Sequence, residues 1–92
     1  MTVNAKFTCP CCGYQTLKEN PQESYEICQV CFWEQDPIQL DDPTYERGAN
    51  QTSLRQAQKN FISFGACDEA MKKNVRQSAK DEPKDKEWKP YQ

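Results

Sequence analysis

Apolar residues are sparse along this chain, and their spacing separates a β-prone N-terminal part from a helical middle part. Three runs, residues 6–9, 14–17 and 25–28, are short and either rich in β-prone residues or alternate polar with apolar side chains. These runs predict three short strands. The dipeptide Asn20-Pro21 lies between the second and the third run, where it predicts a turn.

One helix is predicted over residues 53–64. Ser53 is suited to the N-cap, Gln56 lies three positions later as in a capping box, and Gly65 is suited to the C-terminal stop. The apolar residues of this segment recur three or four positions apart and form one stripe: Leu54, Ala57, Phe61 and Phe64, with Ile62 widening it. Because the chain has few other apolar residues, we expect this stripe to pack into the core.

The segments on either side of this helix have weaker signals. Residues 34–47 contain Pro37, Pro43 and several acids, and we expect an extended loop. Asp68 is suited to cap a second short helix, in which Met71 and Val75 would face inward.

The last part of the chain is rich in Lys, Asp, Glu and Pro. We expect residues 1–76 to form a single domain and residues 77–92 to form a charged, disordered tail. Trp88 and Tyr91 are the only large groups in this tail. They are either incidental or a means of docking a partner.

Composition shows that such a domain needs a covalent or metal cross-link. Leu, Ile, Val and Phe make up 13 of the 92 residues, which is below the ~20% level of ordinary globular chains. A core this small is usually supported by disulfides or a metal ion. The sequence contains six cysteines and no histidine. The absence of histidine excludes Ser-His-Asp and Cys-His catalysis, and it excludes metal sites that use imidazole.

Four of the cysteines have the spacing of a metal site. Cys9 and Cys12 form one C-x-x-C pair, Cys28 and Cys31 form another, and fifteen residues separate the pairs. This is a zinc-ribbon spacing, because each short turn can direct two sulfurs at one ion. Four protein ligands fill the tetrahedron of Zn²⁺, so the pattern predicts one structural zinc ion per chain. Two alternatives are disulfides in an exported protein and thiol redox chemistry at residues 9–12.

The compartment favours metal ligands over disulfides. The N-terminal residues have no apolar stretch typical of a signal peptide, and no apolar run can span a bilayer. We therefore expect a cytoplasmic protein, in which thiols stay reduced. Cys11 is expected to be a bystander with its sulfur on the surface of the first turn, and Cys67 a buried structural thiol. Two minor alternatives concern the ligands. Cys11 could replace Cys9 as a ligand, and Cys67 could be a ligand.

Charge is strongly segregated along the chain. Residues 19–46 carry eight acids and no Lys or Arg, although the net charge of the chain is only −2. Such a segment repels nucleic acid and attracts a basic partner. It is equally compatible with a solvated acidic loop. The aromatic pair Phe32 and Trp33 within it is either exposed as an anchor for a partner or buried against the helix stripe. The residues predicted to bind a protein partner are Phe32, Trp33, Glu34, Asp36, Asp41 and Asp42.

Several segments together resemble the cysteine-rich CPCC family of small bacterial proteins. They are residues 9–14 (CPCCGY), 25–34 (YEICQVCFWE), 48–50 (GAN) and 64–67 (FGAC), and the resemblance extends from residue 7 to about residue 70. Gln29 departs from the pattern, where we would expect proline. The resemblance implies a zinc-ribbon-type domain and, for some relatives, a link with bacterial toxin–immunity systems.

The predicted fold class is small α+β: a zinc-ribbon-like β-hairpin with two cysteine turns, packed on one or two short helices. The function predicted first is a non-enzymatic, zinc-binding protein-interaction module of an immunity or regulatory type. The alternatives are a zinc ribbon that binds nucleic acid and a thiol redox protein that uses residues 9–12. No catalytic constellation accompanies the acids, so no enzyme activity is predicted.

Overall fold

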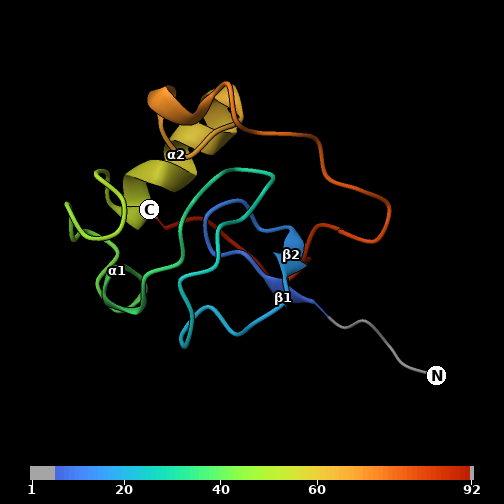
Figure 1. The fold of residues 1–92 in the computed structure, drawn as a ribbon, viewed down its shortest axis with the longest axis horizontal. Coiled ribbons are helices and arrows are strands. Elements are labelled where there is room, and N and C mark those ends of the chain that lie inside the picture. Colours follow the sequence, from blue (N-terminus) through green and yellow to red (C-terminus); the bar gives the residue numbers. More distant parts are fainter. Residues whose placement is uncertain (1–5, 92) are drawn as a thin grey trace.

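The computed structural model describes residues 6–91, in which a small antiparallel hairpin and two helices are joined by long loops (Figure 1). This is a small α+β fold. Its elements are β1 (Phe7–Thr8), β2 (Gln15–Leu17), α1 (Pro37–Asp41), α2 (Leu54–Phe64) and the 3-10 turn η1 (Glu69–Met71). The first five residues of the predicted domain and the last residue of the predicted tail lie outside the described range. Within residues 6–91, no helix has the length and apolarity needed to cross a bilayer.

The hairpin is formed by the first two predicted strands, while the third is reduced to a single bridge. Phe7 pairs with Leu17 in antiparallel register, and the register shifts before Thr8. Of residues 25–28, only Ile27 forms a bridge, with Glu34. The reason is that Cys28 begins a tight turn at once, so the chain reverses before a longer ladder can form.

Helix α1 lies in the segment for which the sequence predicted an extended loop, so that prediction was wrong. Asp36 is the N-cap, and its carboxylate accepts a hydrogen bond of 2.9 Å from the amide of Ile38. Pro37 occupies the first turn, where its missing N–H costs nothing. The buried amide of Gln39 then donates to the carbonyls of Asn50 and Thr52 and ties the following loop to α1.

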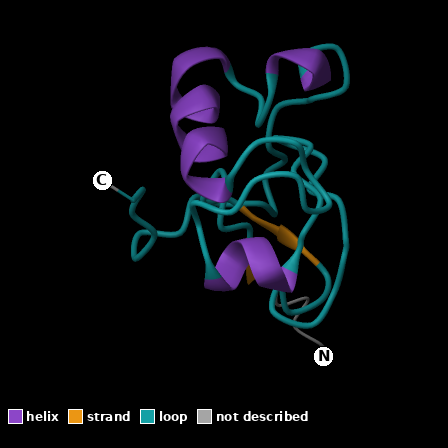
Figure 2. Ribbon diagram, turned by 90° about the vertical axis from the view of Figure 1, so that its left-hand side faces the viewer, coloured by secondary structure: helices purple, strands orange, loops and turns teal. Residues whose placement is uncertain are grey.

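Helix α2 begins and ends where the sequence predicted. Ser53 accepts a hydrogen bond from the amide of Gln56, and Gly65 ends the helix with a φ of 83°. The side chain of Gln56 bonds to Asn60. Leu54 and Ala57 are fully buried and Phe61 and Phe64 are half-buried, but Ile62 is 63% exposed and does not widen the stripe. In both views α2 lies above α1 (Figures 1 and 2).

Thiols make up much of the core. All six cysteines are buried in one cluster with a few aliphatic side chains and Trp33. Trp33 is 1% exposed and is the largest side chain of this cluster. The core therefore lies around the cysteine turns, and the stripe of α2 covers it from one side.

The C-terminal segment folds back onto the domain, in contrast to the predicted disordered tail. In Figure 1 it runs from the hairpin to α2. The amide of Gln15 donates to the carbonyl of Pro83, and the indole of Trp88 donates to the carbonyl of Pro10. The segment is ordered because its backbone pairs with the open edge next to β2 and its tryptophan packs on the first cysteine turn. Residues 82–91 are called the C-terminal strap below.

The two acids of α1 give a matched test of this local structure. The carboxylate of Asp36 satisfies two backbone amides, those of Ile38 and Ala49, whereas Asp41 is exposed. Asp36→Ala should lower the free energy of unfolding by about 2 kcal/mol, because a cap is lost and a second amide loses its partner. Asp41→Ala should change it by less than about 0.5 kcal/mol. Urea denaturation measures both, and equal effects would contradict the assignment of the cap.

Candidate metal centre

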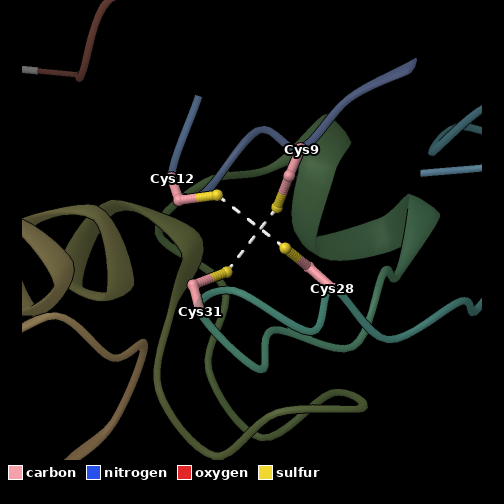
Figure 3. Close-up of side chains that lie close together, drawn as sticks. All are labelled: Cys9, Cys12, Cys28 and Cys31. Carbon is pink, nitrogen blue, oxygen red and sulfur yellow. Dashed lines mark hydrogen bonds between the residues drawn. The ribbon is translucent and has the colours of Figure 1, made fainter. Parts of the chain in front are cut away.

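The first cysteine turn is closed by two backbone hydrogen bonds. The amide of Gly13 donates to the carbonyl of Cys9 at 2.8 Å, and the amide of Cys9 donates to the carbonyl of Tyr14 at 2.9 Å. Gly13 has a φ of 82°, in the left-handed region that glycine adopts without strain. This turn places the side chains of Cys9 and Cys12 on the same side of the chain (Figure 3).

The second cysteine turn repeats the first in every one of these features. The amide of Phe32 donates to the carbonyl of Cys28 at 2.7 Å, and the amide of Cys28 donates to the carbonyl of Trp33 at 2.9 Å. Phe32, at the position equivalent to Gly13, has a φ of 67°. A non-glycine residue in this conformation costs roughly 1–2 kcal/mol. The surrounding structure must therefore hold the turn in this shape, because the sequence alone disfavours it.

The two turns bring four sulfur atoms together. Figure 3 shows Cys9, Cys12, Cys28 and Cys31 pointing toward a common centre. The Sγ atoms of Cys9 and Cys31 are 3.7 Å apart, those of Cys12 and Cys28 are 3.8 Å apart, and all four lie within 4.8 Å of one another.

These distances fit a metal site and not a pair of disulfides. A tetrahedron of sulfurs at about 2.3 Å from a central Zn²⁺ has edges of about 3.8 Å. A disulfide would need about 2.05 Å, and all six cysteines are free thiols. The four cysteines can therefore hold one metal ion with little movement.

Two polar side chains outside the cysteine turns contact the sulfurs. The hydroxyl of Thr16 lies 3.0 Å from the Sγ of Cys28, and the amide of Gln35 donates to the Sγ of Cys9 at 3.6 Å. Such donors stabilise thiolate charge and orient the ligands. Neither residue is predicted from the sequence, because neither belongs to a C-x-x-C pair and only the fold brings them to the site.

The buried thiols influence one another's ionisation. Burial raises the pKa of Cys9 and of Cys31 above the ordinary thiol value. Hydrogen bonding between Cys12 and Cys28 raises the pKa of Cys12 and lowers that of Cys28. Negative charge on these buried sulfurs is costly, and a divalent cation bound among them would offset that cost.

Cys11 and Cys67 belong to the core and not to the four-sulfur cluster. Among residues 6–91, the only group of Cys, Asp or Glu side chains close enough to hold a metal ion is the set of four described above. Cys11 is fully buried, so the prediction of a surface sulfur was wrong. Cys67 is a buried thiol, as predicted, and its amide donates to the carbonyl of Cys31 at 2.9 Å. Burial is the main cause that raises the pKa of Cys67, and the charges of Cys11 and Asp68 raise it further. A raised pKa opposes formation of the nucleophilic thiolate.

The structure buries some of the residues predicted to bind a partner and exposes others. Trp33 is a core residue and Asp36 is 5% exposed and bonded to backbone amides, so neither lies on a binding face. Phe32 and Glu34 are half-buried. Asp41 and Asp42 are exposed at the end of α1.

The fold and the cluster define a class, and the comparison of the sequence with family models defines the family. The class is that of small α+β proteins with a buried four-cysteine cluster able to hold a metal ion. The model of the family described as "Cysteine-rich CPCC" matches residues 7–82, and the chain belongs to this family. The comparison with curated proteins gives no match.

Two neighbouring cysteines give a matched test of the ligand set. Cys12→Ala removes one of four sulfurs, and we expect at least about a hundredfold weaker zinc binding. Cys11→Ala removes an equally buried thiol that lies outside the cluster, and it should keep one zinc ion per chain. Native mass spectrometry after zinc loading compares the two variants. Loss of zinc from Cys11→Ala with retention in Cys12→Ala would overturn the assignment.

Zinc uptake should release protons. Cys9 and Cys31 carry protons at neutral pH in the metal-free protein because burial raises their pKa, and a thiol binds Zn²⁺ only after deprotonation. Apparent zinc affinity should therefore rise with pH and fall on acidification. A pH indicator in weakly buffered solution measures the release when zinc is added. Zinc binding without proton release would show that thiols are not the ligands.

Proposed function

We propose that this protein is a non-enzymatic protein-interaction module built on one structural zinc ion. The observation that carries the proposal is the set of four buried sulfurs at tetrahedral spacing. An all-cysteine tetrahedral site is typical of zinc and of iron–sulfur chemistry, and zinc is the usual ion of two C-x-x-C turns at this spacing. Protein ligands fill all four positions, which leaves none for a substrate.

The site would be of the zinc-ribbon type. Its first turn continues into the β1–β2 hairpin, and its second turn repeats the geometry of the first after a long connection. A core that consists largely of thiols gains most of its cohesion when a metal ion joins them. The ion would therefore stabilise the fold, and the surface of the domain would bind the partner.

The surface next to α1 is the best candidate for partner binding. Pro37, Ile38, Leu40, Asp41, Asp42, Gln22 and Tyr91 line an open depression of 740 Å³. Ile38 is 57% exposed and Tyr91 41% exposed, so apolar and acidic groups are presented together. The acids of residues 19–46 take part in neither of the ion pairs in the part of the chain that the structure describes. Those pairs are Lys6–Asp81 and Arg76–Glu82.

A basic protein segment with an apolar side chain is the complementary partner. The eight acids of residues 19–46 would steer it, and Ile38 would supply apolar contact. Such a surface suits an immunity-type or regulatory protein that binds a basic target. Nucleic acid is disfavoured by the same charges. Thiol exchange is disfavoured because the thiols of residues 9–12 are fully buried.

A pair of matched double variants tests the partner surface. Ile38→Ala with Asp41→Lys removes an apolar contact and reverses one charge, and it should abolish salt-dependent capture of a basic partner from the native cell while zinc content stays at one per chain. The control, Ile62→Ala with Glu69→Lys, makes the same changes at exposed positions on α2 and η1. Equal capture by both double variants would place the interface elsewhere.

A further inference from the structure

We infer that the C-terminal strap is a positioning element of the metal centre: it holds the first cysteine turn closed and slows release of the ion. The inference rests on the proposed zinc site and adds a residue-level account of how the site retains its metal. Four sets of contacts support it, and all of them join the strap to the first turn or to the segments that hold this turn.

The first set is backbone pairing. The amide of Asp85 donates to the carbonyl of Gly13 at 2.8 Å, and the carbonyl of Pro83 accepts from the amide of Gln15 at 2.9 Å. These bonds flank the bridge between Tyr14 and Lys84. The strap thus lies along the edge of the chain opposite to β1 and fixes the residues that follow Cys12.

The second set is formed by Trp88. Its indole N–H donates to the carbonyl of Pro10 at 2.8 Å, inside the C-x-x-C turn itself. Its ring lies directly on Gly13, where an added Cβ would be only 2.6 Å from the ring. The turn therefore cannot open toward the strap while Trp88 is in place.

The third set links the strap to α2 through one amide group. The side chain of Gln58 is buried and donates to the same carbonyl of Pro10 at 2.8 Å. The side-chain oxygen of Gln58 accepts from the backbone amide of Tyr91 at 2.7 Å. The carbonyl of Pro10 is thus held from two sides, and the end of the strap is held by α2.

The fourth set is electrostatic and aromatic. The ammonium of Lys84 lies 4.8 Å from the ring centroid of Tyr14 and 4.7 Å from that of Trp88, so it is held between two aromatic faces. The hydroxyl of Thr8 donates to the carboxylate of Asp85 on the other side of the strap. These contacts anchor the strap at the same residues, 84 and 85, at which its backbone pairs with the first turn.

Metal release requires a ligand sulfur to leave the ion, and the strap makes this harder at one turn only. In the described range, the hydrogen bonds from the strap to the cysteine turns go to Pro10 and Gly13 and none goes to residues 28–31. The first turn can therefore open only after the strap detaches. The family match ends at residue 82, so residues 83–91 of the strap lie beyond the matched region.

The test compares three full-length, zinc-loaded variants with the unchanged chain. Transfer of zinc to a chromogenic chelator in excess gives the release rate. Trp88→Ala should release zinc about tenfold faster, because the hydrogen bond to Pro10 and the aromatic contacts are lost. Trp88→Phe keeps a ring on Gly13 and should release zinc at an intermediate rate. Asp36→Ala is the control for general loss of stability, because the Asp36 carboxylate bonds to the amides of Ile38 and Ala49 and to no residue of the strap. It should release zinc more slowly than Trp88→Ala.

A second readout does not depend on the metal. Hydrogen exchange of the Gln15 amide, which Pro83 protects, should be faster in Trp88→Ala and unchanged in Asp36→Ala. If Trp88→Ala releases zinc no faster than the unchanged chain, or only as fast as Asp36→Ala, the inference is overturned. If the unchanged chain binds no zinc at all, the proposed function fails instead, and the Gln15 exchange still shows whether the strap holds the turn.

Discussion

The convergence of four sulfur atoms in the middle of the core is the interaction on which the rest of the structure depends. Leu, Ile, Val and Phe are too few to support a domain of this size by burial alone, and the core cluster contains six thiols. With zinc bound, such a cluster can contribute about 10–16 kcal/mol, as in zinc-finger peptides. A metal ion at this site would join the two cysteine turns, so that irregular loops could surround the site without a large sheet or helix bundle to hold them.

The two cysteine turns are structural copies with different sequences. Gly13 adopts positive φ at no cost, while Phe32 adopts it at the equivalent position with strain. The first turn is unstrained and is covered by the strap. The second is strained and is held by the bridge between Ile27 and Glu34 and by the contact of Cys67 with Cys31. The same pattern of turn hydrogen bonds thus arises from two different kinds of local support.

The parts of the fold that could be predicted from the sequence are those set by local chemistry. The cap at Ser53, the stop at Gly65 and the C-x-x-C spacing each act over a few residues. The strap could not be predicted, because its charged composition is typical of disorder and its contacts reach back more than seventy residues to Pro10. Helix α1 had a local signal, Asp36 followed by Pro37, which the neighbouring acids and Pro43 obscured. The roles of Thr16 and Gln35 depend on how the turns pack together, which spacing does not describe.

The position of the strap has a practical consequence for handling the protein. Tyr91 is fastened to α2 through Gln58 and also lines the depression beside α1. An affinity tag fused after the last residue would disturb the hydrogen bond between Tyr91 and Gln58, and it would also obstruct the depression beside α1. A tag placed ahead of β1 avoids both effects, so the protein used for purification and pull-down should carry its tag at the amino end.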